Sequence, residues 1–278
     1  MQRCMTWMRG KSMLAYDALI EQAKLRNMPA DKSRGILREY LQILMLKQLY
    51  RTDIGKELYF TGGTYLRLVH GLKRFSEDLD FNAGKITEKE FEDLCKKLVT
   101  ELKRSGIRSE ISFSHWDHVL VGRFNYPDIE RSYGITAKHA RRQGLLIKFE
   151  VNLPDWKVEP ETEVISGYGE TYPCICTEKG ILFADKIDAL VKKGMGRHIY
   201  DIIFMLSRRY PVHDKIFRKL GHKNEPFQVI LDRVNKFTST ELKKQADILR
   251  PFLFEEQEAE LILNAPSIID KLIRKYEA

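Results

Sequence analysis

Residues 59–81 of the chain read YFTGGTYLRLVHGLKRFSEDLDF. Gly62 and Gly63 follow a short apolar run, 58–60, and precede an amphipathic segment, 65–72, so they are expected where a strand turns into a helix. Glycine lets a backbone approach a ligand closely, and a helix N-terminus offers unpaired N–H groups and partial positive charge to a phosphate. This turn therefore predicts a phosphate-binding site.

The same stretch ends in two acids, Asp78 and Asp80, separated by one apolar residue. In an extended strand, side chains two residues apart point to the same side. Two carboxylates on one face are hard oxygen ligands that suit magnesium. Each pattern alone is common on ordinary turns and solvated strands, so it is their combination in one stretch that indicates nucleotide chemistry.

The combined pattern resembles the nucleotidyltransferase signature of the AbiEii-type toxin family. In that signature a Gly-Gly-Thr turn leads through a short helix to an Arg-x-Ser-x-Asp-Leu-Asp-Phe strand. The matching residues here are Gly62, Gly63, Thr64, Arg74, Ser76, Asp78, Leu79, Asp80 and Phe81. The resemblance implies an α+β fold, with a polymerase-β-like nucleotidyltransferase core of mixed sheet and helices and an α-helical C-terminal domain.

Two later segments extend the resemblance. Residues 184–190, ADKIDAL, are similar to the family's lysine motif, and residues 197–201, RHIYD, are similar to its Arg-Asp-x-Tyr-Asp motif. Lys186 and Asp201 are the positions that carry over as functional. His198 stands where the family usually has an aspartate, which leaves the role of that position open.

A third acid comes from a segment that alternates apolar and polar residues, 145–153. This period predicts a strand with Lys148, Glu150 and Asn152 on its polar face. On the pattern alone Glu150 could equally be an ordinary exposed glutamate. In the nucleotidyltransferase superfamily a later strand beside the Asp-x-Asp strand supplies a third acid, and the resemblance makes Glu150 the candidate.

The resemblance implies a template-independent nucleotidyltransferase that acts by two-metal in-line displacement. Asp78, Asp80 and Glu150 would be the metal ligands, holding two Mg²⁺ ions or Mn²⁺ in their place, and Lys186 and Asp201 would join them as catalytic residues. The residues expected to bind the nucleoside triphosphate (NTP) are Gly62, Gly63, Thr64, Arg74, Ser76 and Lys186.

The family consists of toxins from toxin–antitoxin or phage-defence pairs, and some relatives add nucleotides to the 3′ end of tRNA. The resemblance therefore implies an NTP as substrate, tRNA or another RNA as acceptor, and a cognate antitoxin as partner. A formal net charge of +8 is compatible with a polyanionic partner.

Three other functions fit parts of the pattern. An Asp-x-Asp also holds the metal of some nucleotide-sugar glycosyltransferases, which do not need the glycine turn. Aspartate-nucleophile phosphatases place Asp-x-Asp after a buried apolar strand, whereas residues 73–77 here read KRFSE. A basic RNA- or protein-binding pseudoenzyme is disfavoured because the three acids and both glycines are present.

The composition is that of a globular protein, with 43% hydrophobic and 31% charged residues among 278. No segment approaches the roughly 20 apolar residues that span a bilayer, and residues 1–13 lack the apolar stretch of a signal peptide. We therefore expect a cytoplasmic location and no membrane partner. The spacing of the cysteines predicts neither a disulfide framework nor a zinc site.

Periodicity and breakers predict the remaining organisation. An N-terminal helical segment, 1–50, is expected to pack on a nucleotidyltransferase core, 51–160, followed by a helical domain, 161–278. Prolines and glycines between 154 and 176 predict an irregular connection at that boundary. Residues 126–144 are expected to be a basic loop, solvated or in contact with nucleic acid. Further elements are expected as helices over 13–50, 87–104, 224–237, 239–249, 255–263 and 266–277 and strands over 107–114 and 119–125.

Overall fold

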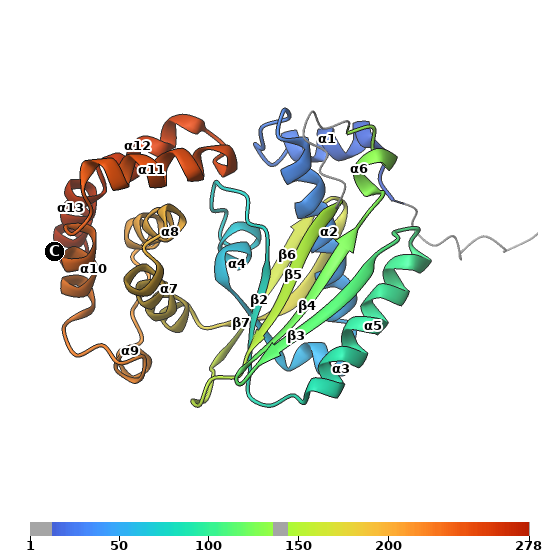
Figure 1. The fold of residues 1–278 in the computed structure, drawn as a ribbon, viewed down its shortest axis with the longest axis horizontal. Coiled ribbons are helices and arrows are strands. Elements are labelled where there is room, and N and C mark those ends of the chain that lie inside the picture. The colour runs from blue at the N-terminus through green and yellow to red at the C-terminus, as the bar shows by residue number, and fades with distance from the viewer. Residues whose placement is uncertain (1–12, 136–143, 278) are drawn as a thin grey trace, which may run out of the picture.

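The computed structural model describes residues 13–135 and 144–277, and its centre is a seven-stranded mixed sheet (Figure 1). The strands are β1 (Leu58–Thr61), β2 (Leu79–Ala83), β3 (Glu110–Trp116), β4 (Val119–Tyr126), β5 (Leu145–Asn152), β6 (Pro160–Gly167) and β7 (Glu170–Thr177). Their spatial order is β3-β4-β5-β2-β1-β7-β6. β2 runs antiparallel to β1 and parallel to β5, so the central strands carry the Asp-x-Asp pair and Glu150 side by side. The predicted α+β class with a mixed sheet is confirmed.

Helices from the first half of the chain cover the sheet on the right-hand side of Figure 1. They are α1 (Tyr16–Lys24), α2 (Ser33–Leu49), α3 (Asp53–Lys56), α5 (Glu88–Arg104) and α6 (Ile129–Ser132). α5 begins at the predicted capping box, in which Thr87 and Glu90 bond each other's backbone N–H groups. The region predicted to be helical, 13–50, is divided into α1 and α2 because Asn27 adopts a left-handed conformation with φ of 55° and Pro29 follows it.

The region predicted to be an irregular connection, 154–176, is largely a β-hairpin, and that prediction is wrong. β6 and β7 are joined by a two-residue turn in which Tyr168 and Gly169 both have positive φ, 53° and 74°, as a type I′ turn requires. β7 is hydrogen-bonded to β1 near Cys176. Pro173 lies three residues before Cys176, where β7 is paired with β6 and not with β1. Its missing N–H therefore removes no hydrogen bond between β7 and β1.

The C-terminal part is helical, as predicted, and gathers on the left of Figure 1. Its helices are α7 (Lys179–Lys193), α8 (Gly196–Ser207), α9 (Asp214–Lys219), α10 (Pro226–Val234), α11 (Ser239–Leu249), α12 (Glu260–Leu263) and α13 (Ala265–Glu277), with 3-10 turns at Arg250–Phe252 and Glu256–Ala259. Because the hairpin belongs to the sheet, we propose that the helical domain begins at Glu178, the N-cap of α7, rather than at 161.

Backbone hydrogen bonds join this helical part to the central motif. The N–H of Phe75 donates to the carbonyl of Phe252, and the N–H of Phe254 donates to the carbonyl of Lys73, at 2.8 and 3.0 Å. The loop before Asp78 is therefore clamped by the C-terminal part. Among the described residues, no helix has the length and apolarity that a membrane span needs. Residues 136–143 of the predicted basic loop lie outside the described residues.

Candidate active site

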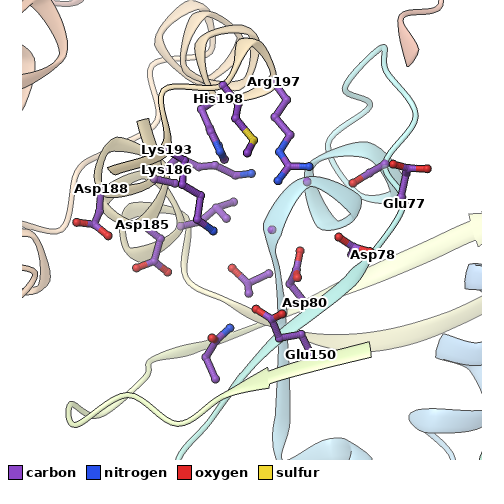
Figure 2. A pocket seen from close by; sticks show the side chains of 18 of the residues that line it. Glu77, Asp78, Asp80, Glu150, Asp185, Lys186, Asp188, Lys193, Arg197 and His198 are labelled. Carbon is purple, nitrogen blue, oxygen red and sulfur yellow. The ribbon is translucent and has the colours of Figure 1, made fainter. Parts of the chain in front are cut away.

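A cleft of about 860 Å³ separates the central strands from the C-terminal helices. Figure 2 shows Asp78, Asp80 and Glu150 on the side of the strands, and Lys186 and His198 on the side of α7 and α8. We call the side with Asp78, Asp80 and Glu150 the acidic wall and the side with Lys186 and Arg197 the basic wall, although Asp185 and Asp188 also line the cleft from α7. Carboxylates facing cationic side chains suit a ligand that carries both metal and phosphate.

The glycine turn packs directly against the catalytic candidates. It lies between β1 and α4 (Gly62–Leu68), as predicted. Gly62 has φ of +80°, and a Cβ at this position would lie 2.3 Å from Oδ2 of Asp80. A Cβ at Gly63 would lie 2.6 Å from Nη2 of Arg74 and 2.8 Å from Oγ of Ser76. Both glycines are thus required by close packing within the site, in addition to any ligand.

Thr64 has a different place from the one predicted. Its side chain is fully buried and its hydroxyl donates a short hydrogen bond to the backbone carbonyl of Asp78. In this structure Thr64 fixes the start of the Asp-x-Asp strand and contributes no surface to the cleft. Gly62, Gly63 and Ser76, by contrast, line the cleft, and their predicted binding of the nucleotide stays a prediction.

The three acids lie close together at the central strands β2 and β5. Asp80 on β2 is directly in register with Glu150 on β5, and Asp78 immediately precedes β2. Burial, with added repulsion from Asp78 and Glu150, raises the pKa of Asp80 to about 6. Burial also raises the pKa of Asp78. The cluster therefore has an excess of negative charge that favours a bound cation.

Lys148 is the cation closest to this cluster. Its Nζ lies 2.7 Å from Oε2 of Glu150 and 3.9 Å from Oδ2 of Asp78. Burial alone would lower the pKa of Lys148, but the hydrogen bond to Glu150 and the charge of Asp78 raise the pKa above its ordinary value. Sequence analysis placed Lys148 on the polar face of this strand without assigning it a role.

The acids fit magnesium in the way that nucleotide enzymes usually bind it. Among the residues that the structure describes, no three His, Cys, Asp or Glu side chains form a group that could hold a metal ion. Mg²⁺ is commonly held by one or two carboxylates, with water and substrate phosphates completing its shell. Asp78 and Asp80 meet that requirement, whereas Glu150 is paired with Lys148.

A buried ionic network lies behind the basic wall. Nε and Nη2 of Arg74 each donate to a different carboxylate oxygen of Asp201, both at 2.8 Å, and Nη1 donates to the carbonyl of Phe75. Nζ of Lys186 donates to Oδ2 of Asp201 at 2.7 Å. Burial alone would raise the pKa of Asp201, but Arg74 and Lys186 outweigh it and hold that pKa well below its ordinary value.

This network gives Arg74 and Asp201 structural positions that the sequence did not specify. Arg74 is 3% exposed; its guanidinium donates to Asp201 and to the carbonyl of Phe75, packs against the glycine turn and also lines the cleft. Asp201 is fully buried and orients Lys186, whose side chain lines the cleft. The ion pair thereby joins two segments that are far apart in the chain, the loop before Asp78, which carries Arg74, and α8, which carries Asp201.

The comparisons with known proteins agree with this geometry. The family model "Nucleotidyl transferase AbiEii toxin, Type IV TA system" matches residues 44–266, most of the chain. The chain belongs to the AbiEii nucleotidyltransferase toxin family. The match spans the glycine turn, the Asp-x-Asp strand and both helices of the basic wall. No curated protein sequence matches the chain.

Solved structures share the AbiEii-family fold seen here. JHP933 from Helicobacter pylori is 19% identical over 87% of this chain and 93% of its own, with a TM-score of 0.54. A putative nucleotidyltransferase from H. pylori is 20% identical over 86% and 95%, with a TM-score of 0.55. MenT4, a nucleotidyltransferase toxin from Mycobacterium tuberculosis H37Rv, is 16% identical over 95% and 93%, with a TM-score of 0.58. At these identities the likeness shows the fold.

His198 is the position at which this AbiEii-family chain departs from the expected motif. The side chain is 6% exposed and lines the cleft, and in the part of the chain that the structure describes neither ring nitrogen has a hydrogen-bond partner. Burial, with the neighbouring charge of Lys186, lowers its pKa to about 3. His198 is therefore a neutral imidazole beside the buried network.

Sequence reasoning missed several other residues of the AbiEii-family cleft. Burial, with the charge of Asp188, raises the pKa of Asp185 to about 7. Both acids line the cleft from α7, the helix that also carries Lys186 and Lys193. Helical spacing within ADKIDALVKK could have placed these residues on one face once α7 was assumed. Residues missed as cleft-lining are Asn82, Lys148, Asp185, Asp188, Lys193 and Arg197.

Proposed function

We propose that this chain transfers a nucleoside monophosphate from an NTP to an acceptor hydroxyl, and that the acceptor is the 3′ end of tRNA. The observation that carries the proposal is the meeting of the glycine turn, Asp78 and Asp80 on one wall of the cleft with Lys186 on the other. A triphosphate carries the negative charge that attracts both Lys186 and a metal ion held by the aspartates. The family's toxin nucleotidyltransferase activity supports the same chemistry.

Each residue has a specific role in this proposal. Gly62 and Gly63 let the phosphates approach the backbone, and Ser76 donates a hydrogen bond beside them. Lys186, held in place by Asp201, stabilises negative charge that develops on the phosphates during transfer. Such electrostatic stabilisation and positioning account for most of the catalysis in phosphoryl-type transfers.

The carboxylates would hold the divalent cations. Asp78 and Asp80 would hold Mg²⁺ or Mn²⁺, and Glu150 would join them in a two-metal site. When bound, the ions would lower the pKa of the acceptor hydroxyl and neutralise the departing pyrophosphate. Support comes from the register of Asp80 with Glu150 on the neighbouring strand, from Asp78 two residues before Asp80, and from the repulsion by Asp78 and Glu150 that helps to raise the pKa of Asp80.

The basic character of the chain supports an RNA acceptor. The formal net charge is +8, and Lys193 and Arg197 lie at the cleft with exposed side chains that could contact RNA phosphates. A tRNA acceptor would place the reaction in the cytoplasm. The type IV family also points to a cognate antitoxin as partner and to a role in defence, including phage defence.

The test is a labelling assay. Purified protein, Mg²⁺, a total tRNA pool and each α-labelled NTP in turn are incubated beside an Asp80→Asn variant. Label should enter tRNA with the wild-type protein and be absent with the variant. Label entering protein instead would overturn the tRNA acceptor. An absence of label in every arm would contradict the function and favour a binding protein without chemistry.

A further inference from the structure

Lys148 occupies the position of a counterion within the acidic wall. It lies on the same face of β5 as Glu150, and its ammonium is 2.7 Å from one oxygen of that residue. The same nitrogen is 3.9 Å from Oδ2 of Asp78. One lysine therefore contacts two of the three acids that the proposed function assigns to divalent cations.

Lys148 is held less firmly than Lys186. Lys186 is 10% exposed at its side chain and is held by the fully buried Asp201. The side chain of Lys148 is 32% exposed, and both of its acidic partners are also partly open, at 34% for Asp78 and 21% for Glu150. An ammonium on a flexible four-carbon stem can leave such partners at a small cost.

We propose that Lys148 is the resident counterion of the carboxylate cluster and is displaced when a divalent cation binds, so that the cation and the NTP bind cooperatively. This inference rests on the proposed function. A divalent ion at Asp78 would lie within a few ångströms of the ammonium, and the two positive charges would repel each other.

A bound NTP would reduce this repulsion between the ammonium and the divalent cation. Its phosphates give the displaced ammonium a new anionic partner in the same cleft, and they also supply ligands to the cation. Each ligand therefore favours binding of the other, and the coupling is reciprocal. Without an NTP, the ion pairs of Lys148 with Glu150 and Asp78 keep the affinity for divalent cations low.

The experiment measures Mn²⁺ binding to the full chain by electron paramagnetic resonance, without nucleotide and with a non-hydrolysable α,β-methylene NTP analogue. Lys148→Met removes the counterion. Lys148→Arg keeps the charge, and Lys193→Met removes one positive charge from the opposite wall of the cleft. Circular dichroism confirms that each variant is folded.

Without nucleotide, Lys148→Met should bind Mn²⁺ about tenfold more tightly than wild type or Lys148→Arg. The reason is that the repulsion between a nearby unit positive charge and a divalent ion weakens the binding of that ion by about tenfold even in water. The factor by which the NTP analogue increases the affinity for Mn²⁺ should be correspondingly smaller in Lys148→Met than in wild type. Unchanged or weaker Mn²⁺ binding by Lys148→Met, or equal tightening by Lys193→Met, would overturn the inference alone. If wild type binds no Mn²⁺ even with the analogue, both the inference and the proposed metal site fail.

Discussion

Replacing Asp201 with asparagine should destabilise the protein strongly. The carboxylate of Asp201 accepts two hydrogen bonds from Arg74 and one from Lys186, and these side chains are only 4% and 10% exposed. The Asp201→Asn variant leaves two buried cations without an ionic partner. Removing one partner of a buried ion pair costs about 3–5 kcal/mol. For a chain of this size that corresponds to a fall in Tm of roughly 10 °C.

The assay is thermal unfolding of wild type, Asp201→Asn and a matched control, Asp270→Asn. Asp270 pairs with Arg274 at 3.0 Å on the exposed face of α13, so its loss should cost less than about 1 kcal/mol. The pKa of Asp201 is depressed in the folded state, so its stabilisation is complete above its unfolded pKa of about 4 and is lost as the pH falls towards the folded pKa. The Tm difference should therefore be the same at pH 8 and pH 6. Equal, small shifts for both variants would refute the structural role given to this network.

Three further predictions concern the cleft. Gly62→Ala should abolish transfer because its Cβ would displace the carboxylate of Asp80. The control is Gly71→Ala, because Gly71 has a similar φ of +77° and no atom lies within 4 Å of the added Cβ. This control should lose only about 1 kcal/mol of stability and keep its activity. The folded pKa of Asp185, about 7, lies above its unfolded value of about 4, so the folded chain binds the extra proton and this group's contribution to stability falls as pH rises from about 4 to 7. The gain in Tm from Asp185→Asn should therefore be largest at pH 8, smaller at pH 5 and smallest at pH 4. His198→Leu should raise Tm in thermal unfolding, because it removes two buried nitrogens that lack partners in the described structure; a fall in Tm would show that these nitrogens are satisfied.

Local sequence patterns were sufficient for the elements that carry the acidic wall. A glycine pair between apolar and amphipathic runs predicted the β1–α4 turn, and alternation over 145–153 predicted the strand that carries Glu150. These signals are strong because one face of each element is buried, so the periodicity is clear. The hairpin over 160–177 lacked such a signal, since β6 lies at the sheet edge and is exposed along most of its length.

Contacts between distant segments could not be predicted in the same way. The pairing of Arg74 with Asp201 joins residues 127 positions apart, and the local periodicity of the sequence holds no information about such a contact. The resemblance marked both residues and assigned Arg74 to the nucleotide; its guanidinium is bonded to Asp201 and Phe75 and also lines the cleft, so nucleotide binding by Arg74 stays a prediction. Lys148 was predicted on the correct face, yet its contact with Asp78 depends on the parallel pairing of β2 with β5.

The most direct test of the central claim compares α-labelled with γ-labelled NTP in the presence of tRNA, using wild type and Asp80→Asn. If Asp80 lies at a nucleotidyl-transfer centre, α label should enter tRNA, γ label should leave as pyrophosphate, and the variant should show neither. Entry of γ label into tRNA would indicate phosphoryl transfer instead, and an active Asp80→Asn variant would contradict the assignment of the carboxylate cluster as the catalytic centre.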